Sequence, residues 1–465
     1  MDGSLLSPST FGGGKIHEEI HYKQRLEDRH TLLDSIKSCS KEKDLHKARI
    51  LHNDILQRSW LSEDICINNA LLSLYAKCGD LSEALKIFDG IPLRNVVSWN
   101  CLVSAYTEHK HIDKAIVCFR KMQNEGVSPN AITYICLLKA CGGGSSKDHG
   151  IGLRNDIECV SMGEEIHAQI EKLGLLEVYT CIGNFLLDMY AKCGLPYIVR
   201  LVFNRLPARD ETSWASLMSS YAEHGLYIQA IECFDGIKRQ GLFANEVSFV
   251  SVLKACCGLK AIEKGREIHR EIAKDGLLGK NALVGNSLID MYAKHGHLEE
   301  ARKVFDEIVF WDVCLWNTLI TGYAQHGYHE AALSCFEEMQ QKGVSPDATT
   351  FICTLKACGN IGASHHGGEL HTEIERRGFL DKEFVGNTLV NMYLKCGSLT
   401  KAQQVFDKLQ VRDVVSWTTL MAGYVEVGKS ESVFHAFEQM LGEGIKPNLI
   451  TFVVVLNACS RQGLL

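Results

Sequence analysis

Neutral polar side chains recur in this 465-residue chain as regularly spaced pairs. An asparagine or threonine is followed by an asparagine or aspartate either 26 or 30 residues later. An amide both donates and accepts hydrogen bonds, whereas a carboxylate only accepts, so such pairs suit recognition of a polar partner. A single asparagine near a helix start could simply cap that helix, but the recurrence favours recognition. The pairs are Asn69/Asn95, Asn100/Asn130, Asn184/Asp210, Asn286/Asp312, Asn317/Asp347, Asn387/Asp413 and Thr418/Asn448.

Catalytic and metal-binding motifs are not found in the sequence. A zinc deaminase needs H-x-E followed by P-C-x-x-C, so that a histidine and two cysteines hold the metal. H-x-E occurs at His17–Glu19, His269–Glu271 and His371–Glu373, always in the same helical pattern, but C-x-x-C does not occur. The nucleophile motif G-x-S-x-G is also missing. The phosphate-binding pattern G-x-x-x-x-G-K-[ST] occurs once, at Gly423–Ser430, but there it spans the turn between two expected repeat helices, whereas a phosphate-binding loop follows a strand. We therefore expect no enzyme activity, no metal and no cofactor.

The composition is that of a globular protein. Apolar residues make up 46% of the chain, and only 7 prolines occur, which suits helices because proline disrupts them. No run of about 18 apolar residues is present, so we expect no membrane segment. The 19 cysteines lie in apolar patterns such as KAC, and we expect them to pack as small buried side chains in a reducing compartment. The net charge of −7 does not itself indicate a nucleic-acid partner.

An internal repeat organises the chain, and four tryptophans mark it. Their successive spacings are 115, 102 and 101 residues, and three blocks of 35, 36 and 31 residues recur in order within 102. The longest interval has 13 extra residues between Cys141 and Gly163, in a Gly/Ser-rich stretch that predicts a flexible surface insertion. The tryptophans are Trp99, Trp214, Trp316 and Trp417.

Each block predicts two short helices. In residues 313–347, apolar side chains recur at spacings of three and four on both sides of a turn at Gly327. Helices of about 12 residues are unstable alone in water. A helix pair cannot bury both of its apolar stripes, so neighbouring pairs must stack. The sequence therefore predicts an all-α superhelix with a long concave face.

The blocks resemble pentatricopeptide repeats, in particular the plant-type arrays that alternate P, L and S motifs. The segments SWN-x-L-x-x-x-Y, L-K-A-C and M-Y-A-K-C-G, in this order, carry the resemblance. It implies a right-handed α-solenoid. Thirteen motifs are expected: L 29–64, S 65–95, P 96–130, L 131–179, S 180–210, P 211–245, L 246–281, S 282–312, P 313–347, L 348–382, S 383–413, P 414–448 and a partial L 449–465.

The two ends of the array need separate interpretation. Residues 1–28 form an N-terminal segment, in which Gly13–Ile20 is either a helical cap or a decayed repeat. The chain stops 17 residues into its last L motif. Many arrays of this kind continue into an E extension and a deaminase domain, and we expect neither here.

The resemblance implies how the polar pairs would read single-stranded RNA, one base per repeat. The fifth residue of the first helix and the last residue of the motif meet one base edge, and the second residue packs on the base face. Asn69/Asn95 and Asn100/Asn130 would then favour C, the four Asn/Asp pairs U, and Thr418/Asn448 A. Ala215/Asn245 departs from the pattern, and the L motifs, with apolar fifth residues, receive no base. The predicted track is n-C-C-n-U-n-n-U-U-n-U-A-n.

Four lysines share one place near the end of the first helix of every S motif. In the family this place faces the RNA backbone, where a lysine can neutralise phosphate. A solvated lysine that complements a helix C-terminus is the alternative. They are Lys77, Lys192, Lys294 and Lys395.

The resemblance implies an RNA-binding specificity factor in a mitochondrion or chloroplast, acting in C-to-U editing with a deaminase supplied in trans. The alternatives are a factor for stability, processing or splicing of an organelle transcript, and a helical scaffold that binds protein only. The N-terminal residues contain no clear transit peptide.

The pair Asn317 and Asp347 tests this interpretation most directly. The two residues lie 30 positions apart, and without RNA we expect no structural reason for them to act together. We also expect both to be exposed, so that substitutions there would hardly change thermal stability.

Overall fold

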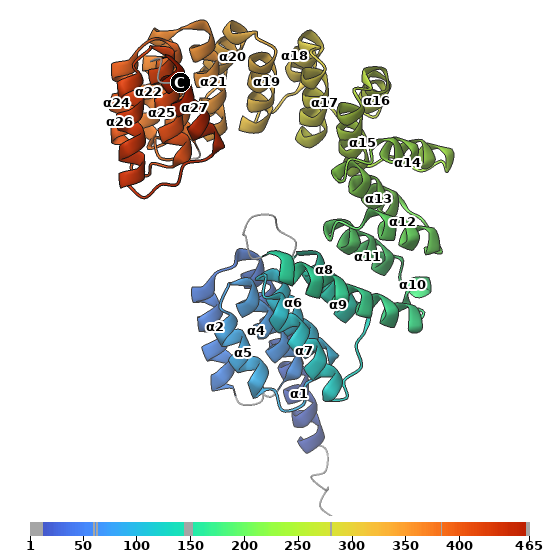
Figure 1. The fold of residues 1–465 in the computed structure, drawn as a ribbon. Helices are drawn as coiled ribbons and strands as arrows, with labels where there is room; N and C mark the ends of the chain where they lie inside the picture. The colour runs from blue at the N-terminus through green and yellow to red at the C-terminus, as the bar shows by residue number, and fades with distance from the viewer. Residues whose placement is uncertain are drawn as a thin grey trace, which may run out of the picture. The chain divides into compact units, whose positions relative to one another are not determined.

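The computed structural model describes residues 13–461 apart from 59–60, 62–63, 144–151, 280 and 383. In this part of the chain the regular secondary structure is helical, and no strand occurs (Figure 1). The chain divides into two compact units, Met1–His224 and Gly225–Leu465, which are described separately. None of the helices in the described ranges combines the length and apolar character that crossing a bilayer requires.

The first unit is a series of short antiparallel helix pairs. Most helices have 10 to 13 residues, while α1 and α9 are longer. The helices are α1 (Gly13–Glu42), α2 (Leu45–Gln57), α4 (Ile65–Lys77), α5 (Leu81–Gly90), α6 (Val96–Glu108), α7 (Ile112–Asn124), α8 (Ala131–Gly143), α9 (Gly152–Lys172), α10 (Leu175–Val178), α11 (Thr180–Lys192), α12 (Pro196–Arg205) and α13 (Glu211–Glu223).

The second unit continues the same pattern. Its helices are α14 (Tyr227–Arg239), α15 (Glu246–Leu259), α16 (Ile262–Lys274), α17 (Ala282–Lys294), α18 (Leu298–Glu307), α19 (Val313–Gln325), α20 (His329–Gln341), α21 (Ala348–Ile361), α22 (Ser364–Arg377), α23 (Val385–Lys395), α24 (Leu399–Lys408), α25 (Val414–Glu426), α26 (Ser430–Gly442) and α27 (Leu449–Arg461).

Within each unit, the first helix of one pair packs on the first helix of the next. This contact runs through α4, α6, α8, α11 and α13, and again through α15, α17, α19, α21, α23, α25 and α27. Because each short helix buries apolar residues against both neighbours, stacking supplies the stability that a single pair lacks. The predicted all-α solenoid is confirmed. The division of the array into P, L and S motifs stays a prediction.

The turn inside each pair depends on a left-handed residue. Gly296 connects α17 to α18 with φ of 78°, and Gly397 does the same between α23 and α24 with φ of 72°. Glycine adopts this conformation without the clash that a Cβ atom creates.

The four repeat tryptophans are buried and join neighbouring pairs. Each packs edge-to-face on a phenylalanine of the preceding helix, with ring centroids 4.6–4.9 Å apart. Beside three of these contacts an arginine donates to the carbonyl of that phenylalanine, as Arg94 does to Phe88 at 3.2 Å. Each arginine directly precedes a terminal residue of the polar pairs, so the junction fixes the chain that leads into them.

A second junction repeats a histidine–tyrosine hydrogen bond. A ring nitrogen of His269 lies 2.9 Å from the Tyr292 hydroxyl, and three other pairs have distances of 3.0–3.2 Å. His269 and His371 belong to the H-x-E patterns, and both therefore contact tyrosines of the following helix. The other pairs are His52–Tyr75, His167–Tyr190 and His371–Tyr393. No group of three potential metal ligands occurs among the described residues.

The expectation of a flexible insertion between Cys141 and Gly163 was partly wrong. Residues 152–162 belong to helix α9, while 144–151 lie outside the described residues. Cys159, Met162, Ile166 and Ile170 are buried at spacings of three and four. This apolar stripe extends the helix toward its N-terminus, although the surrounding Gly and Ser residues suggest a loop.

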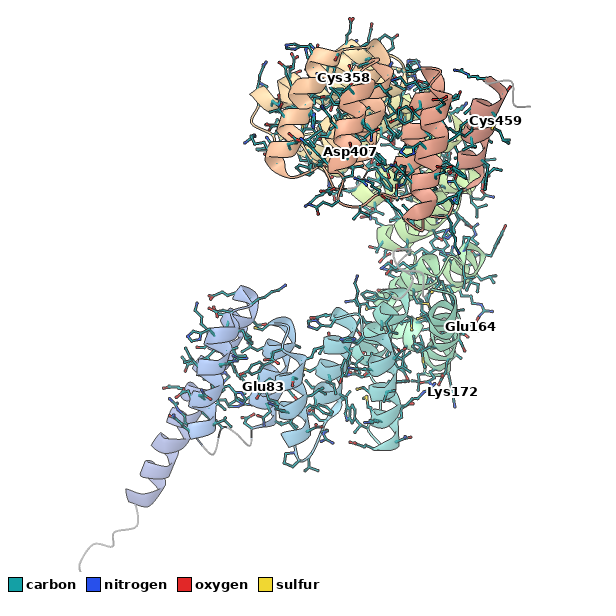
Figure 2. The ribbon with its side chains drawn as sticks, turned by 60° about the vertical axis from the view of Figure 1, so that its left-hand side comes forward. Glu83, Glu164, Lys172, Cys358, Asp407 and Cys459 are labelled. Carbon is teal, nitrogen blue, oxygen red and sulfur yellow. The ribbon has the colours of Figure 1, made fainter. Side chains whose placement is uncertain are left out.

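The N-terminal segment and the cysteines also differ from simple expectation. Gly13–Ile20 lies in α1, which continues without a turn to Glu42, as a helical extension would and a separate helix pair would not. Cys358 is buried in α21 as expected (Figure 2). Cys66, Cys181 and Cys314 are exposed, because the second place of a first helix points away from its packing partners.

The histidine–tyrosine junctions predict a stability loss in mild acid. Burial lowers the pKa of His52, His167, His269 and His371 below 6.5. The unfolded chain then binds protons more readily, so stability should fall as the pH drops through 6.5. We expect a lower melting temperature at pH 5.5 than at pH 7.5.

Replacing the four histidines by glutamine should flatten this profile between pH 7.5 and 5.5. His365→Gln, at an exposed position, is the matched control and should leave the profile unchanged. Equal profiles for the fourfold variant and the parent, followed by circular dichroism, would contradict the assignment.

Candidate functional site

The terminal residues of the polar pairs cap the helices that follow them. The Asp347 Oδ1 atom accepts the Thr350 backbone N–H at 2.9 Å, and Asn95 Oδ1 accepts that of Ser98 at 3.0 Å. The same bond occurs at every other terminal residue, namely Asn130, Asp210, Asn245, Asp312, Asp413 and Asn448. Capping is therefore a real function of these side chains, since the first N–H groups of a helix otherwise lack partners.

The same capping oxygen meets the fifth residue of the preceding first helix. The Asn100 Nδ2 atom donates to Asn130 Oδ1 at 3.0 Å. Asn317 Nδ2 donates likewise to Asp347 Oδ1 at 3.0 Å. The expectation that Asn317 and Asp347 have no structural reason to act together was wrong. Stacking of consecutive first helices brings residues 30 positions apart into one hydrogen-bonded pair.

Two of the polar pairs that are separated by 26 residues make a similar contact. Asn184 Nδ2 lies 3.1 Å from Asp210 Oδ2, and Asn387 Nδ2 lies 3.4 Å from Asp413 Oδ1. Both asparagines are half-buried, unlike the corresponding P-motif residues.

The remaining pairs are joined differently or not directly. Asn286 Oδ1 accepts from the Thr318 hydroxyl at 2.7 Å, while Asp312 caps α19. Thr418 reaches its terminal residue through an intermediate hydroxyl. Asn69 Oδ1 is buried and finds no partner among the described residues, although Asn95 caps α6. Ala215 is buried in α13 of the first unit, and Asn245 caps α15 of the second.

The expectation that Asn317 is exposed was also wrong, and other fifth residues are buried as well. Only 6–9% of the surface of each is exposed in Asn69, Asn100, Asn317 and Thr418. Asp347 is half-buried. Burial raises the pKa of Asp347, but hydrogen bonds from Thr350 and Asn317 outweigh this effect and hold the pKa below its ordinary value. The carboxylate therefore stays ionised at neutral pH.

Sequence reasoning missed a third member of the P-motif clusters. The Thr350 hydroxyl donates to Asn317 Oδ1 at 2.6 Å and accepts the Asp347 backbone N–H at 3.1 Å. Thr133 makes equivalent bonds at 2.7 and 3.1 Å. Thr451 lies 2.9 Å from the Thr418 hydroxyl. The signal was present in the sequence, since each threonine stands three residues after a terminal residue.

Exposed apolar or small side chains flank the clusters at the second place of the first helices. Val97 on α6 and Ile132 on α8, the first helices of neighbouring pairs, are 48% and 57% exposed. This is unusual for residues of this type and recurs along both units. Other exposed second-place residues are Cys66, Cys181, Val247, Leu283, Cys314, Phe384, Val415 and Ile450.

In the first unit, these flanking residues and a polar pair enclose a cavity of about 370 Å³. Its lining includes Val97 and Ile132 together with Asn100, Asn130 and Lys77. The volume lies within the range of small-ligand sites. Apolar walls and an amide floor suit a flat molecule with a polar edge.

The second unit repeats this arrangement at equivalent places. A cavity of about 320 Å³ is lined by Val415 and Ile450, with Thr418 and Asn448. Recurrence of the same four motif places in two separate cavities shows that the repeat itself produces the slot. We call these cavities, lined by a polar pair and two flanking second-place residues, the inter-repeat slots.

The four predicted phosphate-binding lysines are all exposed at the ends of first helices. Lys192 and Lys294 already form ion pairs with the aspartate four residues earlier, at 2.7 and 2.6 Å. Lys395 donates to Asn360 at 2.7 Å, and Lys77 lines the slot of the first unit. Their positive charge is therefore not equally available to a ligand.

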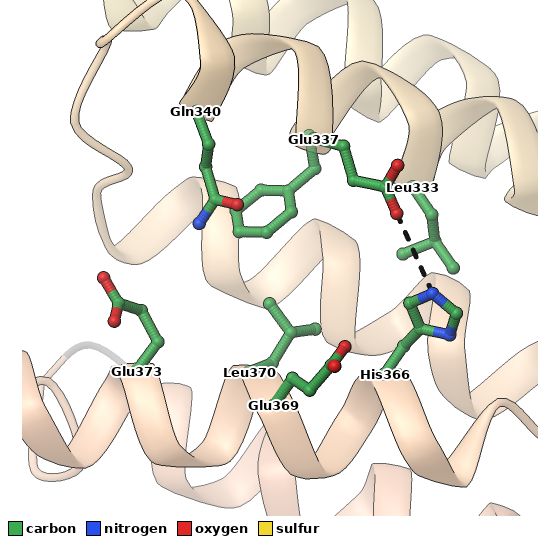
Figure 3. Close-up of a pocket in the computed structure, with 8 residues that line it drawn as sticks. Leu333, Glu337, Gln340, His366, Glu369, Leu370 and Glu373 are labelled. Atoms are coloured by element: carbon green, nitrogen blue, oxygen red, sulfur yellow. Dashed lines mark ion pairs between the residues drawn. The ribbon is translucent and has the colours of Figure 1, made fainter.

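A different cavity, of about 380 Å³, lies between the second helices α20 and α22 (Figure 3). Three glutamates surround an apolar floor, and each lies beside a histidine or arginine. Glu337 lies 3.8 Å from His366, and Glu369 lies 3.6 Å from His365. Arg376 and its neighbour Arg377 lower the pKa of Glu373 to about 2. The floor is formed by Leu333, Phe336 and Leu370. We therefore place the candidate site in the inter-repeat slots.

The stacked hairpins and their repeated polar clusters define an α-solenoid repeat protein. The pattern described as "PPR repeat family" matches residues 94–143, 311–360 and 412–461, and the "PPR repeat" pattern matches 69–96, 212–242, 286–313 and 387–414. This chain belongs to the pentatricopeptide repeat family.

Curated relatives from Arabidopsis thaliana agree with this membership. The chloroplastic pentatricopeptide repeat-containing protein At4g18520 is 31% identical over 90% of this chain and 66% of its own length. The mitochondrial At3g02330 is 30% identical over 92% of this chain and 48% of its length. At2g13600 is 31% identical over 93% and 69%. The chain thus spans about half to two thirds of the relatives it matches. The names of the first two place those proteins in a chloroplast and a mitochondrion.

Solved structures of similar fold include PPR10 in complex with an 18-nt psaJ RNA element. It has a TM-score of 0.71, 17% identity, and coverage of 97% of this chain and 71% of that chain. The structure of PPR10 from maize gives a TM-score of 0.53, also with 17% identity, over 97% of this chain and 75% of that chain. At this identity the likeness shows the fold.

Because the Asp347 oxygen accepts both the Thr350 N–H and the Asn317 amide, two substitutions at Asp347 should change the stability of α21 by different amounts. Asp347→Ala removes the cap and the partner of Asn317, which should cost about 0.5–2 kcal/mol locally. Amides at the start of α21 should then exchange hydrogen roughly 2- to 30-fold faster. Asp347→Asn keeps a capping oxygen and is the matched control. Equal exchange in both variants, measured by mass spectrometry, would contradict this account.

Proposed function

We propose that the chain binds single-stranded RNA sequence-specifically, with one nucleotide at each P or S motif. The recurrent inter-repeat slots carry this proposal. An unstacked base presents two apolar faces and one polar edge. The second-place side chains would contact its faces, and the fifth and terminal residues would hydrogen-bond its edge. Val97, Ile132, Asn100 and Asn130 stand in these places in the first unit.

The pairs would choose bases by their hydrogen-bonding atoms. We assign C to Asn69/Asn95 and Asn100/Asn130, and A to Thr418/Asn448. We assign U to the four Asn/Asp pairs, at Asn184, Asn286, Asn317 and Asn387. The proposed track from 5′ to 3′ is n-C-C-n-U-n-n-U-U-n-U-A-n. The RNA complex formed by PPR10, which shares the fold, supports nucleic acid as the ligand class.

The proposed biological role is that of an organellar specificity factor for C-to-U editing. The array would select the transcript, and a deaminase acting in trans would perform the reaction, so we propose no catalysis by this chain. Stability, processing or splicing of an organelle transcript is the alternative role for the same binding. A helical scaffold that binds only protein is the alternative of another class. The slots favour RNA over the scaffold, because their polar floors have the chemistry of base edges.

Selection from a random RNA pool tests the proposal directly. We expect enrichment of sequences that match the track at its seven assigned positions. A second selection, with the purified Asn317→Thr variant, should change the ninth position from U toward G and leave the other positions as they are. Recovery of no shared sequence by the parent would favour the scaffold.

Measured affinities give the size of this change. One mismatched base typically costs about 1–3 kcal/mol, so affinity for the U and G versions should shift by roughly 5- to 150-fold. Asp347→Asn should instead turn the preference toward C. If both variants fold and keep the preference of the parent, the pairwise assignment is wrong even though RNA is bound.

The lysines predict an unequal dependence of binding on salt. Lys77→Ala should reduce the slope of log affinity against log salt by about 0.7, the value for one phosphate contact on a single strand. Lys192→Ala should have less effect, because Asp188 already pairs with that lysine at 2.7 Å. Lys86→Ala, on the second helix α5, is the matched control. A slope unaffected by Lys77→Ala would show that this lysine does not contact phosphate.

A further inference from the structure

We infer that Thr133 and Thr350 are positioning residues that set the base selectivity of their P motifs. Each hydroxyl fixes the amide of the fifth residue, Asn100 or Asn317, in one orientation. The amide then turns an N–H donor toward the base, while its carbonyl oxygen accepts the threonine hydroxyl. This inference rests on the proposed function and adds a residue to the site that stands outside the fifth and terminal pair.

The threonine hydroxyl is buried and bonded on both sides. Thr350 is 0% exposed. Its oxygen accepts the Asp347 backbone N–H at 3.1 Å, and the same oxygen lies 2.6 Å from Asn317 Oδ1 and 2.9 Å from Asp347 Oδ1, the two acceptors within reach of its hydrogen. The corresponding distances from Thr133 are 3.1 Å to the Asn130 nitrogen, 2.7 Å to Asn100 Oδ1 and 3.2 Å to Asn130 Oδ1. In both clusters the shortest contact is with the fifth residue.

A count of hydrogen-bonding atoms shows what remains for a base. The amide of Asn317 has two hydrogens on Nδ2 and one acceptor, Oδ1. One hydrogen goes to Asp347 Oδ1 at 3.0 Å, and Oδ1 receives the threonine hydrogen. One N–H is left for a ligand. A flipped amide would place its oxygen against Asp347 Oδ1, which already accepts the Thr350 N–H and has no hydrogen to give.

The orientation therefore originates in the helix cap. The capping carboxylate of Asp347 can only accept hydrogen bonds, and its Oδ1 atom already accepts the Thr350 backbone N–H. The Asn317 amide therefore turns its Nδ2 atom toward Oδ1, and the Thr350 hydroxyl donates to the Asn317 carbonyl oxygen. A fixed donor can bond a base acceptor but cannot rotate to meet a base N–H. Such locking should exclude bases that present a donor at this point, because a buried unpaired donor is costly.

The S motifs provide an internal comparison, because their third-place residues do not make this bond. The hydroxyls of Ser213 and Ser416 instead contact the backbone carbonyls of Asp210 and Asp413, both at 2.8 Å. In the S motif of Asn286 the third place of the next helix is occupied by a leucine. The fifth asparagines of these three motifs are half-buried. P motifs with threonine should therefore discriminate bases more sharply than S motifs.

Substitution of the threonine tests the inference with a readout that stability alone would not change. Thr350→Val keeps the shape and removes the hydroxyl, whereas Thr350→Ser retains it. Affinities are measured for four RNAs that differ only at the ninth position of the track. We expect Thr350→Val to reduce the ratio of U to purine affinity by roughly fivefold or more, in line with the loss of about 1 kcal/mol of discrimination or more. Thr350→Ser should restore the ratio.

Two further variants complete the test. Ser213→Ala removes the third-place hydroxyl that contacts the Asp210 carbonyl. This variant should leave the preference for U at the fifth position of the track unchanged. Thr133→Val repeats the experiment at the third position of the track, in the other unit, and decides the matter if Thr350→Val does not fold. Circular dichroism establishes folding of each variant.

The outcomes distinguish failure of the positioning role from failure of the proposed RNA recognition. If the parent selects the track and either folded valine variant keeps the base ratios of the parent, the positioning role is wrong and RNA recognition stands. If the parent shows no base preference at any assigned position, the proposed function itself fails. Loss of affinity for all four RNAs in equal proportion would also overturn the positioning role, because it would indicate a purely structural threonine.

Discussion

One hydrogen bond links the fold of this protein to its candidate site. At the terminal residue of each polar pair, an asparagine or aspartate oxygen accepts a backbone N–H from the start of the next helix. The helices are short, so a lost cap would affect a large part of each one. At Asn100 and Asn317 the amide of the fifth residue donates to the same oxygen. Helix capping and, under the proposed function, base recognition therefore depend on one shared atom.

This sharing has a consequence for how specificity can vary. Asparagine and aspartate cap helices about equally well, because each supplies the Oδ1 acceptor. They differ in the second atom, which is a donor in Asn130 and an acceptor in Asp347. That atom is not needed by the cap, so its chemistry can change without loss of the helix. Under the proposed function, base choice can thus vary along the array while the scaffold remains constant.

The repeat period made most of the fold predictable from the sequence. Burial and hydrogen bonding of individual side chains could not be predicted in the same way. Periodicity identified the helix pairs, their stacking and the places of the polar pairs. It did not reveal that Asn317 is buried or bonded to Asp347, because that contact depends on how consecutive first helices approach each other. The helical start of α9 was hidden by neighbouring glycines and serines. The exposure of Cys66 was likewise not predicted, because cysteine is usually buried. Cys66 is exposed because it stands at the second place of a first helix.

The negative net charge says little about the inter-repeat slots, because many carboxylates form ion pairs between the second helices. Successive second helices are joined by ion pairs, including Arg205–Glu171 at 2.9 Å, Arg302–Glu338 at 2.9 Å and Lys408–Glu375 at 2.8 Å. These contacts balance charge away from the first helices that line the slots. A ligand in a slot meets the local field of amides and first-helix side chains such as Lys77, while net charge reports the whole surface. An acidic repeat protein can therefore present sites with the local chemistry to bind a polyanion.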